Sequence, residues 1–270
     1  MISSIRLDHI VIAVLNLETA VGDYTRLGFN VTTGGRHTHA PTRNALIYFD
    51  DGTYLELIEW LAPANGEKWY ESLGRSGEGI VDFALCPEDL ASVIDRTGGV
   101  GAAYLAPVPG SRLQPGGEEI RWQLGWPIDR VLPFLCADIT PRSLRVREGD
   151  CRQHPNGVKG IRELAVGVPN LDAAIPIYER LLQSKASYPG GSEAVGDSPG
   201  PRTAVFHVGE SDLLLVEPEN VKASGASTSR LLLALRGPGV YRFVLKVAGQ
   251  ESIPFDRALT HGASMSIGIA

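Results

Sequence analysis

The sequence is poor in cysteine, which disfavours folds that depend on disulfides or on thiolate-bound metal. Its 270 residues include three cysteines, Cys86, Cys136 and Cys151, and none of them stands in a CxxC pattern. An odd number of cysteines without paired spacing argues against a disulfide framework and favours a reducing compartment. We therefore expect a fold that is held together by its hydrophobic core.

Long apolar runs and an excess of positive charge are also missing. No stretch of the sequence approaches the length of about 20 apolar residues that a membrane-spanning helix needs. The N-terminal residues lack the basic region and the cleavage site of a secretion signal. The formal net charge of −6 disfavours nucleic acid and anionic membranes as partners, because both attract basic surfaces. These features predict a cytoplasmic protein whose partner is a small molecule.

What is present is an ordinary globular composition in a chain that is longer than one typical domain. Hydrophobic residues make up 43% of the chain and charged residues 21%. The length exceeds the roughly 100–200 residues of a single domain. We expect either two domains or one domain built from repeated units.

The most informative pattern is an internal repeat. LDHIVIAVLNLETAVGDY at 7–24 aligns without a gap with IRELAVGVPNLDAAIPIY at 161–178. Each segment predicts a strand followed by a helix that an asparagine caps. NALIYFDDGTYLELIEW at 44–60 and TAVFHVGESDLLLVEP at 203–218 both predict a β-hairpin in the corresponding place. Ordered recurrence of three elements indicates a repeated structural unit.

Weaker copies of the same unit lie between and after these segments. Residues 79–99 predict a strand, a turn and a helix, and 118–126 and 130–139 predict two strands. A curtailed unit follows at the C-terminal end, with a strand at 240–247, a short helix near 254–261 and a last strand.

Proline, glycine and charge mark the connections between these elements. Residues 107–117 and 189–201 are predicted as loops, and the charged stretch 141–158 is predicted as a linker. The prediction is an α+β chain of βαβββ units in two regions. Region 1–150 holds two units, at 5–60 and 79–140, and region 151–270 holds one unit and an incomplete one.

These segments resemble a known superfamily. LDHIVIAV, NLETA and YLELIE resemble the opening unit of vicinal-oxygen-chelate proteins, and RWQL, LPFL and HPNG resemble its glyoxalase-like branch, over roughly residues 5–160. The resemblance implies paired βαβββ units whose mixed sheets curl into a half-open barrel. It also implies a divalent metal (Zn, Mn, Ni or Fe) in the cleft, and a homodimer as an open expectation.

Two ligand positions of the metal-dependent members are matched in this sequence. The histidine of LDHI is His9, and the first glutamate of ELIE is Glu56. An imidazole and a carboxylate on neighbouring strands can converge on one ion and leave positions open for substrate oxygens. The same residues can instead act directly as acid and base.

The second unit departs from the family pattern. Its counterpart of His9 is Asp82, and its counterpart of Glu56 lies in the apolar strand LPFLCAD. The third unit has Glu163 and Leu214 at these positions. His9, Glu56 and Asp82 are therefore the candidate metal ligands. Ring-cleaving dioxygenase chemistry, which needs two histidines and a carboxylate, ranks low.

Other residues are candidates for substrate binding. Asn44 and Tyr48 share one face of a predicted strand, whereas Arg121 and Trp122 point to opposite faces, so only one of these two can reach the cleft. His37 and His39 lie in a predicted surface loop and are expected to be exposed. Arg43 is a further candidate, as an anchor for a carboxylate or a phenolate. Tyr24 and Tyr178, which the repeat aligns, are expected to be packing residues.

Two functions from different classes are compatible with this pattern. The first is a lyase or isomerase that moves protons through His9 and Glu56 on a small oxygenated metabolite, by isomerisation, elimination or cyclisation, with or without a divalent metal. The alternative is a binding protein that sequesters a small molecule without catalysis. Loss of the second-unit ligands favours the binder, and retention of both first-unit residues favours the enzyme.

Overall fold

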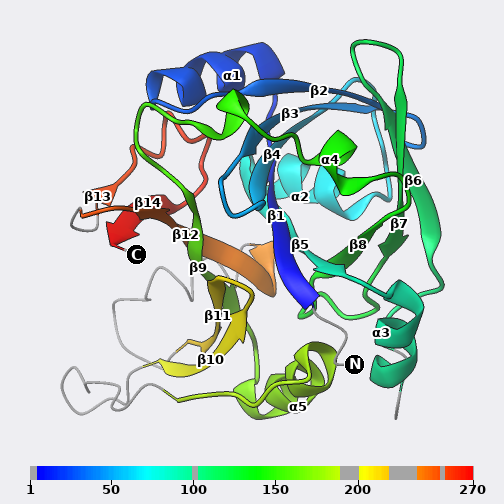
Figure 1. Ribbon diagram of the computed structural model, residues 1–270. Helices are drawn as coiled ribbons and strands as arrows, with labels where there is room; N and C mark the ends of the chain where they lie inside the picture. The colour runs from blue at the N-terminus through cyan, green and yellow to red at the C-terminus, as the bar shows by residue number, and fades with distance from the viewer. Residues whose placement is uncertain (1–4, 99–102, 189–200, 219–235, 250–252, 270) are drawn as a thin grey trace.

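The strands form two sheets in the computed structural model (Figure 1). The structure describes residues 5–98, 103–188, 201–218, 236–249 and 253–269. Eight strands close into a barrel in the order β1-β4-β3-β2-β6-β7-β8-β5. The other six form a sheet in the order β10-β11-β9-β12-β14-β13. The predicted α+β class with curled mixed sheets is confirmed.

The barrel consists of two βαβββ units. The first contains β1 (Ile5–Ala13), α1 (Leu17–Arg26), β2 (Thr32–His37), β3 (Thr42–Tyr48) and β4 (Tyr54–Trp60). The second contains β5 (Gly79–Pro87), α3 (Leu90–Thr97), β6 (Val108–Leu113), β7 (Glu119–Gly125) and β8 (Phe134–Asp138). Helix α2 (Lys68–Ser76) connects the units.

The second sheet contains the third unit and the curtailed fourth. Its elements are β9 (Gly160–Gly167), α5 (Leu171–Leu182), β10 (Arg202–Val208), β11 (Ser211–Glu217), β12 (Gly239–Val247), β13 (Ile253–Pro254) and β14 (Met265–Ile269). The connection from the barrel carries α4 (Arg142–Arg145) and a 3-10 turn, η1 (Asp150–Arg152).

The barrel closes because strands of the two units pair at both seams. β1 lies antiparallel to β5, and β2 pairs with β6 through Arg36 opposite Leu113 and His37 opposite Arg112. The first unit therefore pairs with the second. The sequence did not decide whether its partner is the second unit or the third. The second seam also closes the barrel further than the half-open form that the resemblance implied.

Three local predictions need correction. Residues 107–117, predicted as a loop, contain strand β6. Pro109 of this strand has no N–H to donate, but it lies outside the part of β6 that pairs with β2, so no hydrogen bond to β2 is lost. The helix expected near 254–261 is a series of turns. The predicted linker 141–158 is tied to the barrel: the ring of His154 bonds to the backbone of Asn30 and of Tyr48. Most of the predicted loop 189–201 lies outside the described residues.

The capping predictions are confirmed in both full repeats. The side chain of Asn16 accepts a hydrogen bond from the backbone N–H of Thr19, and that of Asn170 from Ala173. Gly28 follows α1 with φ +84, a conformation that glycine adopts without strain. Each asparagine thus satisfies one N–H that the first helical turn leaves unpaired.

One hydrophobic core joins the barrel to the second sheet, and a separate one fills part of the barrel interior. The shared core includes Tyr24 of α1 and Tyr178 of α5, both fully buried as packing residues. The interior cluster includes Val11 and Ala13 of β1. Because one core serves both sheets, the division into domains near residue 150 stays a prediction.

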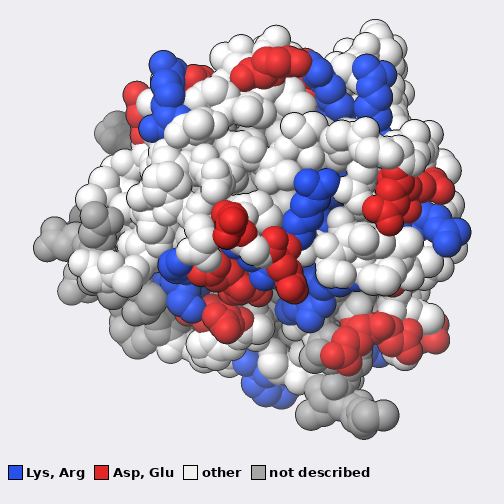
Figure 2. Space-filling model, turned by 45° about the horizontal axis from the view of Figure 1, so that its top comes forward, with Lys and Arg blue, Asp and Glu red and all other residues white. Residues whose placement is uncertain are grey.

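Charged side chains of both signs are mixed on the face of the molecule that Figure 2 shows. The basic ones form no continuous patch in the part of this face that is described. No described helix is long and apolar enough to cross a membrane.

The helix caps give a first test of the repeat. We expect Asn16→Ala and Asn170→Ala each to lower the free energy of unfolding by about 1 kcal/mol, because each removes a cap acceptor. Asn16→Asp and Asn170→Asp keep the acceptor and are the matched controls. Urea denaturation measures the difference; equal losses for the Ala and Asp variants would contradict the capping role.

Candidate active site

A cavity of about 480 Å³ lies inside the barrel. This volume is in the range of pockets that hold small molecules, roughly 300–1,000 Å³. The four tryptophans of the chain all line it: Trp60, Trp69, Trp122 and Trp126. The cavity is therefore rich in tryptophan, and a group of polar side chains lies together at one side of it.

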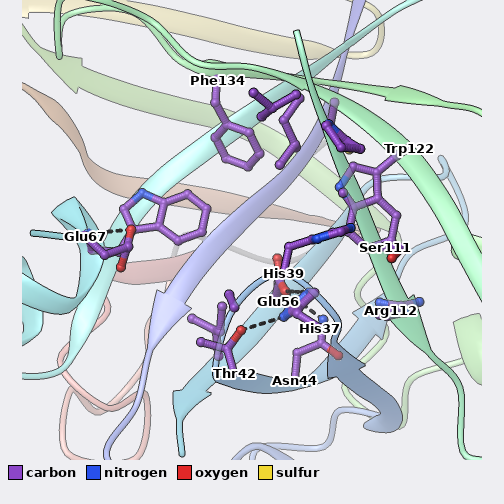
Figure 3. Close-up of a pocket in the computed structure, with 18 of the residues that line it drawn as sticks. His37, His39, Thr42, Asn44, Glu56, Glu67, Ser111, Arg112, Trp122 and Phe134 are labelled. Carbon is purple, nitrogen blue, oxygen red and sulfur yellow. Dashed lines mark hydrogen bonds and ion pairs between the residues drawn. The ribbon is translucent and has the colours of Figure 1, made fainter. Parts of the chain in front are cut away.

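The polar side is built by the first unit, one side chain from each of its strands. His9 comes from β1, His37 from β2, Asn44 from β3 and Glu56 from β4. Figure 3 shows His37, Asn44 and Glu56 close together below Trp122 and Phe134. Strand alternation explains the arrangement, because Leu55 and Leu57 flank Glu56 and pack into the shared core on the opposite side of the sheet.

The carboxylate of Glu56 is the point where these polar groups meet. Its Oε2 lies 3.4 Å from Nε2 of His9, and its Oε1 lies 3.7 Å from Nε2 of His37. The amide of Asn44 donates to Oε1 at 2.7 Å. The amide donor of Asn44 and the imidazole of His9 stabilise a negative charge on Glu56.

A bulge in β1 orients His9. The register between β1 and β5 shifts between Leu7 and His9, so Asp8 is the additional residue of the strand. The side chains of Asp8 and His9, which a regular strand would turn to opposite faces, meet with Asp8 Oδ2 and His9 Nδ1 2.8 Å apart. The ring of His9 also stacks on Tyr54, with centroids 4.5 Å apart. Its Nε2 is thereby directed at Glu56.

Two arginines of α4 hold the bulged aspartate. Arg145 bonds to Asp8 through Nη1 at 2.6 Å and Arg142 through Nη1 at 2.6 Å. Arg145 also bonds to Asp138 of β8, at 2.5 Å and 3.0 Å. Asp8 is fully buried and the side chain of Arg145 is 2% exposed, so this central pair is isolated from water, whereas Arg142 and Asp138 are 22% and 15% exposed.

The network sets the protonation of the site. Burial alone would raise the pKa of Asp8, but Arg145, the bond from His9 and Arg142 hold it well below its usual range. Burial would lower the pKa of His9, but the bonds to Asp8 and Glu56 raise it above 6.5. Against its own burial, the bond from His9, the positive charge of His9 and the bond from Asn44 lower the pKa of Glu56 to about 2. The two neighbouring carboxylates thus favour the protonated form of His9.

His37 is part of the site, which corrects the prediction of an exposed loop. It ends β2, its side chain is 15% exposed, and its Nδ1 lies 2.8 Å from the hydroxyl of Thr42. Burial lowers the pKa of His37, so its imidazole is neutral beside the charged His9. His39 is exposed and lines the same cavity.

Some of the predicted site residues lie outside this group. Trp122 lines the cavity and Arg121 is exposed, in agreement with their opposite parity. Tyr48 is buried beyond the cavity, where its hydroxyl donates to the carbonyl of Arg145 at 3.0 Å. Asp82 is held away by α2: Lys68 bonds to it at 2.5 Å and the indole of Trp69 at 2.9 Å.

The predicted ligand set is therefore not assembled. His9 and Glu56 come together, but Asp82 does not join them. The second-unit residues nearest to His9 are apolar: Ala84 lies opposite it in register and Phe134 packs on its ring. Among the described residues, no three histidine, cysteine, aspartate or glutamate side chains form a group that could hold a metal ion. The side chains present do not fit a multi-ligand metal centre.

Sequence reasoning missed the arginines of the site. Arg145 lay in the stretch predicted as a linker, and Arg112, which also lines the cavity, lay in the stretch predicted as a loop. Asp8 is part of the LDHI motif, but regular strand alternation predicts that its side chain points away from the cleft. The cluster of arginines and other charged residues in 141–158 was the signal that could have indicated the arginines.

The fold defines a barrel of the vicinal-oxygen-chelate superfamily, with two paired βαβββ units around a cavity. The chain belongs to the family of glyoxalase-like domain proteins, whose pattern matches residues 7–182. This confirms the resemblance that the motifs indicated. No curated protein matches the sequence.

Solved structures share the fold at low sequence identity. A hypothetical protein from Staphylococcus aureus is 14% identical with a TM-score of 0.70, over 98% of this chain and 100% of its own. A mutant of 4-hydroxymandelate synthase from Streptomyces coelicolor is 20% identical with a TM-score of 0.64, over 92% and 72%. A xylose isomerase-like TIM barrel/4-hydroxyphenylpyruvate dioxygenase fusion protein is 17% identical with a TM-score of 0.52, over 92% and 38%.

The buried ion network gives a stability prediction. We expect Arg145→Met to lower the free energy of unfolding by about 3–5 kcal/mol, because it leaves Asp8 and Asp138 buried with less compensation. Arg142→Met is the matched control, since that side chain is 22% exposed and shares the same partners, and its loss is expected to be smaller. Equal, small losses in urea denaturation would contradict the central place of Arg145.

The protonation of the site can be measured directly. NMR titration is expected to give His9 a pKa above 6.5 and His37 one below it, and Glu56→Gln is expected to lower the value for His9 by removing a negative partner. Because folding raises the pKa of His9, its charged form adds stability that is complete below pH 6.5 and is lost as the pH rises through the folded pKa. A His9 value that does not respond to Glu56→Gln would refute the coupling.

Proposed function

We propose that the protein is an enzyme that catalyses proton transfer on a small oxygenated metabolite, by isomerisation, elimination or cyclisation. His9 is the general acid and Glu56 the general base. The observation that carries this proposal is the pair itself: an imidazolium and a carboxylate 3.4 Å apart at one side of an aromatic cavity. Proton transfer by such positioned groups contributes typically about 10²–10⁴-fold to a rate.

The pair is suited to act on a carbon acid beside a carbonyl group. Glu56 Oε2 removes the proton from carbon, and His9 Nε2 delivers its proton to the oxygen on which negative charge develops. The free carboxylate is a weak base, since its pKa is about 2. When a substrate oxygen takes the N–H of His9, Glu56 loses the bond that lowers its pKa and becomes a stronger base. Substrate binding thus switches on the base.

The neighbouring side chains support these roles. Asp8 bonds to Nδ1 of His9 and keeps Nε2 directed into the cavity, which is the function of an orienting carboxylate. Asn44 holds one oxygen of Glu56 and leaves the other facing His9. Neutral His37 is placed to take or return a proton on the second oxygen of Glu56, 3.7 Å away.

Sequestration without catalysis is the second candidate. Apart from the polar side, the wall is aromatic: Trp69, Trp126 and Phe134 pack on one another with ring centroids 5.2–5.3 Å apart. Such a wall binds planar molecules by apolar contact and needs no acid or base. Sequestration would give no role to the buried, charged and hydrogen-bonded pair of His9 and Glu56. We therefore favour the enzyme.

Deuterium exchange tests the proposal. Wild-type protein in D₂O is expected to exchange C–H protons next to the carbonyl in a panel of α-hydroxy ketones and 2-oxo acids, followed by proton NMR. Glu56→Gln and His9→Gln are each expected to lower the exchange rate by about 10²-fold or more. Glu59→Gln is the matched control, because Glu59 lies on the same strand and pairs with Arg43 instead.

Two further measurements separate the candidates. Saturable ligand binding without exchange of any compound in the panel would contradict proton transfer and support sequestration. Elemental analysis of the wild type and of a His9→Ala, Glu56→Ala double variant tests the divalent metal that the family resemblance implied. One equivalent of metal that the double variant loses would refute direct acid–base action by these two side chains.

A further inference from the structure

Arg112 is a buried cation of the cavity that has no anionic partner. It lies on β6 opposite His37 of β2, it lines the cavity, and it is 3% exposed. Its hydrogen bonds among the described residues leave from Nη2, to the carbonyl of Arg145 at 3.2 Å and the hydroxyl of Tyr48 at 3.5 Å. Its buried Nε has no partner. No described carboxylate lies within ion-pair distance of it.

An arginine in this position needs an anion. A guanidinium does not lose its proton in proteins, so Arg112 is charged while buried. Burying an unpaired charge is unfavourable, and buried charges are as a rule paired or bound to a ligand. Arg145, the other arginine that lines the cavity, has carboxylate partners in Asp8 and Asp138. Of these two lining arginines, Arg112 is the one for which the described residues supply no counter-ion.

The charged side chains that line the cavity point the same way. Glu56 lies within ion-pair distance of His9 and His37, and Arg145 of Asp8 and Asp138. Glu67 accepts hydrogen bonds from the backbone of the first turn of α2. Arg112 is left with a positive charge and no described carboxylate, which a ligand with a single carboxylate can balance.

The neighbourhood of Arg112 also defines what the anionic group is attached to. Gly110, two residues before it on β6, lies opposite Trp122 of β7. A Cβ on Gly110 would lie 2.3 Å from Nε1 of Trp122, so only glycine lets the indole pack against this strand. Trp122 in turn meets His37 edge to face, with centroids 6.0 Å apart. The guanidinium and an aromatic wall are therefore side by side in one cavity.

We propose that the ligand of this cavity is a monocarboxylate with a planar, apolar body, and that Arg112 binds its carboxylate. The body lies against the tryptophans, and the carboxylate accepts hydrogen bonds from the guanidinium that the fold leaves unpaired. The proposal rests on the proposed function in placing substrate in the same cavity, and it names the class of that substrate. It does not depend on the proton-transfer chemistry.

The tryptophans give a direct measurement of binding, because all four line the cavity. Fluorescence is titrated with phenylacetate and with phenylacetamide, which have nearly the same shape and differ in charge. Wild type is expected to bind the acid at least about tenfold more tightly, in keeping with the strength of hydrogen bonds to charged groups. Arg112→Met is expected to lose this preference and to bind the amide as wild type does.

Arg121→Met is the matched control, since Arg121 lies on the adjacent strand and is exposed. It is expected to keep the preference. Equal affinity of wild type for acid and amide, no saturable quenching by either probe, or a preference that survives in Arg112→Met would each overturn the proposal. Arg112→Met is expected to melt no lower than wild type without ligand, because it removes an unpaired buried charge. Phenylacetate is expected to raise the melting temperature of wild type and of Arg121→Met, but not that of Arg112→Met.

The Glu56→Gln variant separates this proposal from the proposed function. Retained preference for phenylacetate in that variant, together with no deuterium exchange by wild type, would leave Arg112 as an anion site in a binding protein. Deuterium exchange by wild type with no preference for the acid would keep the proton-transfer function and refute the carboxylate site. The two failures are thus distinguishable.

Discussion

The ion network of Asp8 and Arg145 is the interaction on which the rest of the site depends. It joins β1, β8 and the connection after the barrel, and its central pair, Asp8 and Arg145, is closed to water. A charge buried in this way is stable only when its partners stay in place, so the network fixes the position of all three segments. It also fixes His9: the carboxylate that two arginines hold is the one that orients the imidazole. The carboxylate of Asp8 thus contributes both to the stability of the fold and to the orientation of His9.

The local elements were predictable because they depend on residues close in sequence. Helix caps at Asn16 and Asn170, the hairpin after Asn44, and the inward position of Glu56 follow from turn chemistry and alternation. Strand β6 was not predictable, because proline and glycine indicate a loop unless the neighbouring strands are known. The space at Gly110 is used by Trp122 of the next strand, which no local pattern reveals.

The site was predictable only in part, for the same reason. His9 and Glu56 stand in motifs, and alternation places both on the cavity side. Asp8 required knowledge of a bulge, and a bulge is a feature of strand pairing rather than of one strand. Asp82 has the parity of a cavity residue, yet Lys68 of α2 takes its carboxylate. Whether a polar side chain reaches the cavity is decided by partners that are distant in sequence.

The two units of the barrel contribute different kinds of side chain to the cavity. The first contributes the hydrogen-bonding cluster around Glu56, and the second contributes Trp122, Trp126 and Phe134 to the wall. In a symmetric pair both units would present polar ligands to a central ion. The function that we propose therefore places the reactive end of a bound molecule on the first unit and its apolar body on the second. Arg112 and Ser111 are polar lining residues of the second unit, and Arg112 lies at the seam with β2, where the proposed carboxylate would be bound beside the first unit.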